Sequence, residues 1–391
     1  MATLSRREFL RGVAATGAAL AFGNLMIPPA RAALPPRRVV HVHSNAATNW
    51  DYATGWYGDY VNQTVVDALT DRGVTDLTNT ATRADAWHAL IPAYVAGQKV
   101  AIKINLNNAD CGDSDQTIDA LPQPINSIIR GLKAIGVAET DIWVYDVTNG
   151  WHNGEMPTRL VNKVTTLYPS VQFHSNEPGC SIALGYSGSQ RIHFKVPPGK
   201  PAISDRPICN ALVNADYLIN LPIMKKHGMA GVTLGFKNHF GSFDRCDLVH
   251  WSVDLGDGAY VATYNGLIDL YNNPHIKNKT VLVVGDALFG ARIDNYSEVP
   301  SVWTTFGNKS PNSLFFSADP VAIDCVMYDF LDAEGGVPTG SDDYLKLANT
   351  AGLGAYEHWD GAQQYHLIDY RRISLDATPG WNYLPLISRG E

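Results

Sequence analysis

Short runs of apolar and β-branched residues alternate with helical patterns along most of the chain, and this alternation constrains the fold more than any other feature. A strand–helix–strand succession favours parallel pairing, because the helix returns the chain to the start of the next strand. The predicted strands are Arg38–His43, Lys99–Leu106, Asp141–Asp146, Tyr217–Leu221, Thr280–Val284 and Ser313–Ser317. The predicted helices are Asp59–Arg72, Pro124–Ile135, Thr158–Tyr168, Ile208–Asn214, Thr263–Tyr271, Pro320–Asp332 and Asp342–Thr350. We therefore expect an α/β fold, with a largely parallel, mixed sheet flanked by helices.

The 391 residues are enough for one large domain or for two smaller ones. The segment 177–207 is rich in Gly, Ser and Pro, and it is the candidate boundary between two α/β lobes that enclose a crevice. We expect a signal segment over residues 1–32, the α/β domain over 33–376 and a C-terminal tail over 377–391.

The N-terminus has the order of a twin-arginine export signal. Arg6 and Arg7 stand in Ser-Arg-Arg-Glu-Phe-Leu, a mildly apolar Gly/Ala-rich run follows, and Ala30-Arg31-Ala32 supplies a small-x-small cleavage pattern. The alternative is an N-terminal helix with a chance arginine pair, and the full order of the three features argues against it. The apolar run is shorter than the roughly 20 residues that span a bilayer. We expect export by the twin-arginine machinery to the periplasm or the medium, without a stable membrane anchor.

Charge and cysteine usage argue against several partners and cofactors. The formal net charge is −8, so electrostatics gives no reason to expect nucleic-acid binding. The five cysteines lie far apart with no C-x-x-C pair. This spacing argues against a cysteine-ligated iron–sulfur cluster or a zinc ribbon. An odd number also leaves at least one thiol without a partner inside the chain.

Polar residues stand at the ends of four predicted strands. Lys103 and Asn105 share one face of the second strand, and Asp146, Asn220 and Asp286 each end another. In an open α/β sheet the ligand crevice lies beyond the carboxyl ends of the strands, so these residues are expected to converge on one site. Asn and Asp at such positions also cap the following helix or turn, which is the structural alternative. No cap explains Lys103, so for this residue the functional interpretation is favoured.

The segment 221–241 contains the densest group of basic and polar side chains in the sequence. Its polar members are Lys225, Lys226, His227, Thr233, Lys237, Asn238 and His239. Cations in Gly-rich, apolar surroundings are costly unless they meet an anion, and glycines let the backbone approach a ligand closely. If residues 230–240 are helical, Thr233 and Lys237 share a face. We interpret the segment as a site for a carboxylate, a phosphate or an acidic cofactor; the alternative is a solvated basic loop.

A carboxylate pair follows the last predicted strand. Asp319 precedes Pro320 and is best placed as the N-cap of the next helix. Asp324 lies five residues further along, among apolar residues. A buried carboxylate there calls for a cationic partner, and Lys237 or Lys103 could serve.

Three histidines form a second candidate cluster. His41 and His43 share a face of the first strand, and with His152 they could hold a metal. The alternative is that they hydrogen-bond the nearby backbone. We predict no metal site.

Taken together, these segments resemble the domain-of-unknown-function 362 family. The motifs that carry the resemblance are Val100–Leu106, Ala215–His227 with Thr233, Lys237-Asn238-x-x-Gly241, Asp319–Asp324 and Leu345–His358. They span about residues 38–370 when the flanking elements are included. Many members of that family carry a ferredoxin-like, cysteine-rich cluster domain, and this sequence lacks such cysteine spacing. The resemblance therefore does not imply an iron–sulfur cluster here.

A more distant likeness is to the nickel-pincer lactate racemases. It rests on His227-x-x-x-Gly231 followed by Lys237. In that family the lysine tethers the pincer nucleotide and the histidine is an acid/base, which would make Lys237 a cofactor anchor or anion clamp and His227 a proton-transfer residue. The Ser-Gly-Gly of the racemases is replaced by Thr233-Leu-Gly-Phe, and their nickel-binding histidine has no secure counterpart.

Two functional hypotheses of different classes result. The first is an exported enzyme that holds a small anionic substrate or cofactor and uses His227 for proton transfer; the second is a non-catalytic periplasmic protein that binds a ligand or cofactor in the same crevice. The predicted catalytic residues are His227, Lys237 and Asp324. The predicted ligand-binding residues are Lys103, Asn105, Asn220, Lys225, Lys226, Thr233, Asn238 and Asp286. The sequence identifies neither the cofactor nor the reaction.

Overall fold

The computed structural model describes residues 34–106, 109–112, 116–147, 155–176, 180–256, 262–292, 298–362 and 364–376. The predicted signal segment, the predicted tail and His152 lie outside these residues.

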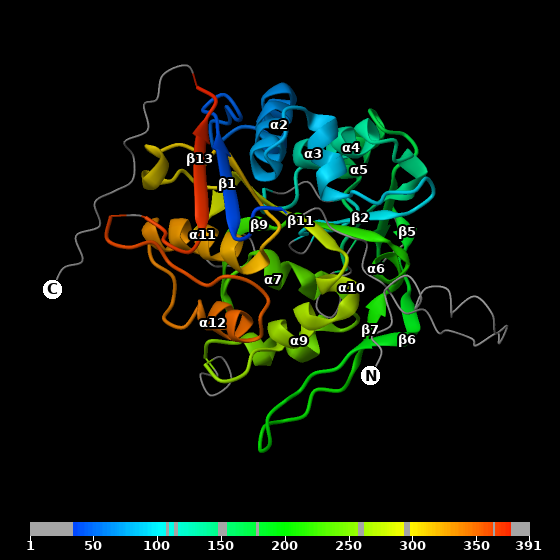
Figure 1. The fold of residues 1–391 in the computed structure, drawn as a ribbon, viewed down its shortest axis with the longest axis vertical. Coiled ribbons are helices and arrows are strands. Elements are labelled where there is room, and N and C mark those ends of the chain that lie inside the picture. The colour runs from blue at the N-terminus through cyan, green and yellow to red at the C-terminus, as the bar shows by residue number, and fades with distance from the viewer. Residues whose placement is uncertain are drawn as a thin grey trace, which may run out of the picture.

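One large sheet organises the described part of the chain (Figure 1). Its eleven strands are β1 Arg38–His43, β2 Val100–Lys103, β3 Ile142–Tyr145, β4 Gln172–Ser175, β5 Ile182–Ala183, β8 Tyr217–Asn220, β9 Ile223–His227, β10 Gly231–Val232, β11 Thr280–Ala291, β12 Ser313–Ser317 and β13 Asp369–Ser374. The strand order is β13-β1-β12-β11-β8-β2-β3-β4-β5, and β9 adds to β11 and pairs with β10.

Most neighbouring strands of the sheet are parallel, as the sequence predicts. The parallel block runs from β11 through β8, β2, β3 and β4 to β5. The antiparallel pairs are those of β12 with β11 and β1 and that of β10 with β9, while β13 lies parallel to β1. The sheet is therefore mixed but largely parallel, and the predicted fold class is confirmed.

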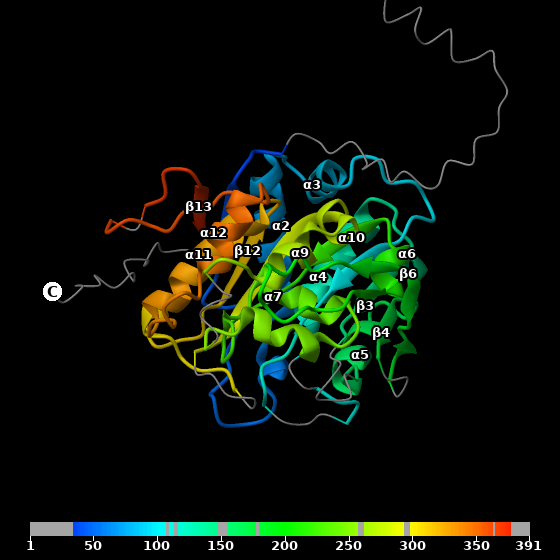
Figure 2. The same cartoon turned by 90° about the horizontal axis from the view of Figure 1, so that it is seen from below.

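Helices cover both faces of the sheet (Figures 1 and 2). One face packs against α2 Gln63–Thr78, α3 Arg83–Leu90, α4 Pro122–Ala134 and α5 Thr158–Thr165. The other packs against α6 Asn210–Asn214, α7 Gly235–Asn238, α9 Gly266–Asn272, α10 Pro274–Lys277, α11 Pro320–Ala333 and α12 Asp343–Thr350. Short 3-10 helices are η1 Tyr57–Tyr60, η2 Glu139–Asp141, η3 His239–Ser242, η4 Cys246–Val253 and η5 Thr304–Phe306. We call the side of the sheet covered by α2, α3, α4 and α5 the α2 face. The opposite side is the α11 face.

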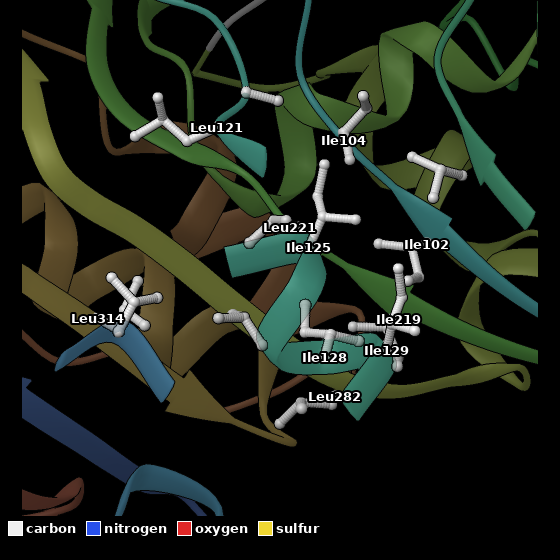
Figure 3. Close-up of a cluster of buried hydrophobic side chains, with 14 of the residues drawn as sticks. Ile102, Ile104, Leu121, Ile125, Ile128, Ile129, Ile219, Leu221, Leu282 and Leu314 are labelled. Carbon is white, nitrogen blue, oxygen red and sulfur yellow. The ribbon is translucent and has the colours of Figure 1, made fainter. Parts of the chain in front are cut away.

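Helix α4 packs on the α2 face through apolar side chains (Figure 3). Ile125, Ile128 and Ile129 recur at helical spacing and are fully buried. They belong to the same core cluster as Ile102 of β2 and Ile219 of β8. Fully burying side chains of this size stabilises the fold by about 1.5–3 kcal/mol each, so this layer fixes the strands that carry the polar residues on the opposite face.

Several boundaries differ from the sequence prediction. Helix α2 begins at Gln63 rather than Asp59, because the side chain of Asn62 caps it by accepting from the backbone N–H groups of Thr64 and Val65. Strand β11 continues to Ala291 instead of ending at Val284. The segment 177–207 contributes β5 to the main sheet and also contains most of the β6 Tyr186–Ile192 and β7 Arg206–Cys209 hairpin.

Within the described ranges, no helix combines the length and the apolar character that crossing a membrane requires.

Candidate functional site

Two neighbouring strand ends bring the first site residues together. Lys103 ends β2 directly beside Asn220, which ends β8. Asn238 of α7 links them, because its amide donates to Asn220 Oδ1 (2.7 Å) and its own Oδ1 accepts from Lys103 Nζ (3.2 Å). The Asn105 amide donates to the same Asn238 oxygen (3.2 Å). Asn220 in turn donates to the backbone oxygen of Gly235 (2.9 Å), so the strand ends also hold the start of α7.

Lys103 is a fully buried cation with a carboxylate partner. Its Nζ lies 2.8 Å from Asp146 Oδ1, and the Asp146 carboxylate also accepts from the backbone N–H groups of Leu106 and Val147. Burial lowers the pKa of Lys103, and the charge of Asp146 opposes that shift. Gly241 lies against this pair, since a Cβ there would stand 1.7 Å from Asp146 Oδ1 and 2.7 Å from Lys103 Nζ. A side chain at position 241 would therefore displace the ion pair.

Lys237 is a second buried lysine, and its partner is different. Its Nζ lies 3.0 Å from His250 Nε2 and 3.8 Å from the centre of the Phe240 ring. His250 Nδ1 lies 3.0 Å from the backbone oxygen of Cys246, which only an N–H can bond. The ring proton is therefore on Nδ1, and Nε2 accepts from the lysine. Burial, with the charges of Lys225 and Lys103, lowers the pKa of Lys237 to about 7.

His227 is half-buried and lies next to His250. Its Nδ1 accepts from the backbone N–H groups of Met229 and Ala230, at 3.2 and 3.1 Å. The neutral ring therefore carries its proton on Nε2. The His227 ring stacks on His250 with centres 5.9 Å apart and planes 15° apart. Burial and the charge of Lys237 lower its pKa well below the usual value, so the neutral imidazole dominates at neutral pH. We call Lys225, His227, Lys237 and His250 the basic cluster.

Of the remaining polar residues in the segment 221–241, some are buried in the protein and others lie near its surface. Lys225 is buried in the middle of β9 and interacts electrostatically with the rest of the basic cluster, since its charge lowers the pKa values of Lys237 and His227. Lys226 reaches the backbone oxygen of Gly335 (3.4 Å) on the exterior. Residues 230–240 are not one helix: only Gly235–Asn238 is α-helical. Thr233 is therefore not one turn from Lys237, and its buried Oγ1 has no hydrogen-bond partner among the described residues.

Asp324 has neutral partners rather than the lysine that the sequence predicts. Its carboxylate accepts from the N–H groups of Gly235 (2.8 Å) and Phe236 (3.1 Å) and from the Tyr344 hydroxyl (3.0 Å). Burial raises its pKa to about 7. Asp324 thus fixes the first turn of α7, which carries Lys237, and acts as a positioning residue. The neighbouring Asp319 caps α11, as predicted, by accepting from Val321 and Ala322.

Asp286 is separated from the other site residues by the sheet. Because β11 continues past residue 284, side-chain alternation decides which way Asp286 points. It lies opposite Leu314 in the ladder, and Leu314 packs in the core of the α2 face. Burial raises the pKa of Asp286 to about 7, and the Leu288 N–H donates to it (3.0 Å). Asp286 therefore lies on the opposite face of the sheet from Lys237.

The histidine pair on β1 contacts neighbouring side chains and backbone. His41 bonds the Tyr370 hydroxyl and Ser313 Oγ (both 2.8 Å), and His43 bonds the backbone oxygen of Pro311 (2.9 Å). No three His, Cys, Asp or Glu side chains in the described ranges are grouped so that they could hold a metal ion.

Sequence reasoning missed His250 and Tyr344. His250 lies in the 3-10 helix η4, inside a segment predicted only as a long irregular cover. Its signal is weak, since a single histidine among Trp, Ser and Asp residues has no motif spacing. Tyr344 follows the predicted start of α12 and contacts Asp324 only through the tertiary fold.

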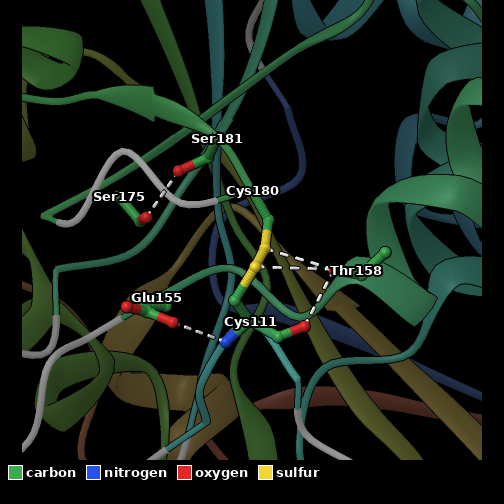
Figure 4. The surroundings of a disulfide bond; sticks show 6 residues. All are labelled: Cys111, Glu155, Thr158, Ser175, Cys180 and Ser181. Atoms are coloured by element: carbon green, nitrogen blue, oxygen red, sulfur yellow. Dashed lines mark hydrogen bonds between the residues drawn. A yellow bond between two sulfur atoms is a disulfide. The ribbon is translucent and has the colours of Figure 1, made fainter.

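A disulfide closes a loop next to the strand ends (Figure 4). Cys111 follows β2 and Cys180 precedes β5; their Cα atoms are 5.7 Å apart across a sequence separation of 69. Thr158 Oγ1 donates to the backbone oxygen of Cys111 (2.8 Å) and to Cys180 Sγ (3.1 Å), and Glu155 accepts from the Cys111 N–H (2.8 Å). The loop that carries Asn105 is thereby attached to the segment beside β4. Cys209, Cys246 and Cys325 are buried thiols.

Comparison with known families identifies the group to which the protein belongs. The family described as "Domain of unknown function (DUF362)" matches residues 100–329. The chain belongs to the DUF362 family. The matched DUF362 region begins at β2 and ends in α11, so it contains the Lys103–Asp146 pair, the basic cluster and Asp324. A search of curated proteins finds no match.

Solved structures give distant matches to this DUF362 chain. The lactate racemase apoprotein from Thermoanaerobacterium thermosaccharolyticum is 14% identical with a TM-score of 0.35, over 70% of this chain and 56% of that one. A protein from Thermotoga maritima is 14% identical with a TM-score of 0.33, over 61% of this chain and 53% of that one. The matched part thus spans about half the length of either protein. TM-scores this low carry no information about the site.

Proposed function

We propose that this DUF362 protein is exported and binds a small anionic substrate or cofactor on the α11 face, at the basic cluster and the adjoining Lys103–Asn238 network. In this proposal Lys225 and Lys237 provide the positive charge, while Asn105 and Thr233 provide hydrogen-bonding groups. Lys226, which lies on the exterior, and Asp286, on the α2 face, are left out of it.

The observation that carries the proposal is the concentration of buried cations in an acidic protein. Lys103, Lys225 and Lys237 are 0%, 4% and 8% exposed, and their charges influence one another, while the chain as a whole has a formal net charge of −8. Buried ammonium groups close together repel unless an anion compensates them. Asp146 compensates Lys103. A bound anion would compensate the protonated form of Lys237, whose hydrogen-bond partner is a neutral imidazole.

Acid–base chemistry at the bound anion is the enzymatic form of this proposal. His227 and Lys237 have pKa values shifted by burial toward neutral, proton-accepting forms, and such shifts cluster at functional sites. His227, half-buried with its proton on Nε2, is the proton-transfer residue. The alternative function is a non-catalytic binding protein that uses the same charges. His227→Gln separates the two, because it is expected to retain binding and to stop turnover only in an enzyme.

Export places the protein in the periplasm or the medium, with the twin-arginine machinery as its transport partner. The Cys111–Cys180 disulfide supports this location, because disulfides persist in oxidising compartments and are rare in the cytosol. The acidic net charge gives no reason to propose a nucleic-acid partner.

Purification from an export-competent host tests the proposal directly. Native mass spectrometry and elemental analysis of the purified protein would reveal a co-purifying anion, nucleotide or metal. Lys237→Ala is expected to lose it, since removing one partner of a buried charge pair costs on the order of 2–5 kcal/mol of affinity. Lys279→Ala is the matched control, because Lys279 is also buried (6% exposed) but precedes β11 at the other end of the strand. Equal retention by Lys237→Ala and Lys279→Ala would reject the site.

A further inference from the structure

We propose that Lys237 is a nucleophile toward carbonyl compounds: its Nζ, held by His250 Nε2, adds to the aldehyde or ketone group of a small anionic molecule and forms an imine. This inference rests on the proposed anion site and names the class of molecule that the site would take.

The first argument is the lysine's partner. Among the described residues no carboxylate lies within ion-pair distance of Lys237, whereas Lys103 has Asp146 at 2.8 Å. His250 cannot act as a counter-ion, because its Nδ1–H is held by the backbone oxygen of Cys246 and its Nε2 accepts from Lys237. An amine that donates one N–H to a neutral acceptor keeps a lone pair for bond formation. The lowered pKa of Lys237 agrees with this arrangement, since a lysine becomes a nucleophile when burial and other cations favour its neutral form.

The second argument is a second imidazole beside the one that contacts the amine. His250 Nε2 contacts the amine, and the His227 ring stacks on it at the half-buried end of the cluster. The His227 proton is on Nε2, because Nδ1 accepts from Met229 and Ala230. The cluster therefore contains a base next to the amine and, on His227, an N–H group that can donate a hydrogen bond to the carbonyl oxygen.

The reaction balances without an oxidant or reductant. The Nζ lone pair forms a bond to the carbonyl carbon, and the electron pair of the C=O bond moves to oxygen, which takes a proton. The nitrogen releases a proton, which His250 Nε2 accepts. The resulting carbinolamine then loses its hydroxyl group with one proton as water, and the C=N bond forms. The positive charge of Lys225 favours a carbonyl compound that also carries an anionic group, such as a 2-oxo acid.

Reductive trapping tests the proposal on the unmodified chain. The probe is glyoxylate at pH 7 with cyanoborohydride, which converts an imine into a stable carboxymethyl-lysine that peptide mapping locates. An exposed lysine with a pKa near 10.4 is neutral in only about one molecule in 2,500 at that pH. We expect Lys237 to be labelled at least ~10-fold faster than the exposed Lys346 and than the buried Lys279. Labelling spread evenly over the exposed lysines, or favouring Lys279, would overturn the proposal.

Two variants and one uncharged probe complete the test. Lys237→Arg keeps a cation but forms no imine, so its specific label should disappear. His250→Gln should slow labelling of Lys237 by ~10-fold or more; an unchanged rate would contradict the role of the imidazole. Acetaldehyde should label Lys237 more slowly than glyoxylate if the anion is recognised, and equal rates would overturn that specificity. If glyoxylate raises the melting temperature but leaves Lys237 unlabelled, the nucleophile is rejected and the anion site stands; if it does neither, both fail.

Discussion

Lys237 donates a hydrogen bond of 3.0 Å to a ring nitrogen of His250, whereas Lys103, in the adjoining network, forms a 2.8 Å ion pair with Asp146. The two lysines are comparably buried, so the difference between them lies in their partners. A carboxylate holds the proton on Lys103, and a neutral imidazole gives Lys237 no such support. The site thus combines an ion-paired lysine with an amine whose pKa lies near neutral pH.

This relationship predicts a pH-dependent stability that Lys237→Met should remove. The folded pKa of Lys237 is about 7, below its unfolded value of about 10.4. Above pH 10.4 both states are neutral and there is no penalty. As pH falls toward 7 the unfolded chain binds a proton that the folded chain does not, so the free energy of unfolding decreases, by up to about 4–5 kcal/mol.

Urea unfolding at several pH values measures that effect. Relative to wild type, Lys237→Met should gain stability as the pH is lowered from about 10 to 7. Lys279→Met should behave similarly over a narrower window, because the pKa of Lys279 falls only to about 8. A wild-type-minus-variant difference that stays flat across this range would show that Lys237 remains charged.

The Lys103–Asp146 pair should show strong coupling in a double-mutant cycle. Lys103→Met alone leaves a buried carboxylate uncompensated and is expected to cost about 3–5 kcal/mol of unfolding free energy. Lys103→Met combined with Asp146→Leu removes both charges and should cost less than the sum of the single variants. Additive costs would contradict the ion pair. Gly241→Ala should also destabilise the protein, because its Cβ would collide with Asp146.

The fold was predictable because its signals are local. The β-branched runs locate β1, β2, β3, β8 and β12 within a few residues and mark the start of β11, and Asp319 with Pro320 marks the start of α11. The site was predictable in part for the same reason, since Lys103 and Asn220 occupy the carboxyl ends of strands that prove to be neighbours. Parallel topology alone brings such ends together.

The features that the sequence did not predict depend on the length of a strand or on tertiary contacts. The side of the sheet on which Asp286 lies depends on β11 continuing to Ala291, because each added residue reverses the face. The neutral partners of Asp324 are backbone N–H groups, which every residue carries and no sequence pattern marks. His250 reaches Lys237 from a 3-10 helix without a recognisable motif.

Asp324 should act on Lys237 through the backbone of α7. Asp324→Ala leaves two buried N–H groups and the Tyr344 hydroxyl without their acceptor, which is expected to cost about 2–5 kcal/mol of stability. Tyr344→Phe removes only one of the three bonds and should cost about 1 kcal/mol. Asp319→Ala removes a helix cap, so it should reduce stability without altering the pKa of Lys237. If Asp324→Ala also left that pKa unchanged, Asp324 would have no positioning role.

The disulfide should stabilise the protein only in its oxidised state. Closing a loop with a sequence separation of 69 is worth at most about 4 kcal/mol through the entropy of the unfolded chain. Reduction, or replacement of Cys111 and Cys180 by serine, should lower the urea midpoint by a matching amount. Cys325→Ser is the comparison, because its thiol is buried elsewhere in the fold and its variant should still respond to reductant. An unchanged midpoint in the double serine variant would show that the bond does not form.

Export and the redox state of Cys111 and Cys180 should change together. Replacing Arg6 and Arg7 with lysines is expected to retain the precursor in the cytoplasm, because the arginine pair is the recognised element of the signal. The cytosol keeps thiols reduced, so the retained chain should have both cysteines open to alkylation after denaturation, whereas the exported wild type should have neither. Cell fractionation followed by a thiol-dependent gel shift measures location and oxidation in one sample. Normal export of the lysine variant would reject the twin-arginine assignment, and an exported chain with both thiols free would reject the disulfide instead.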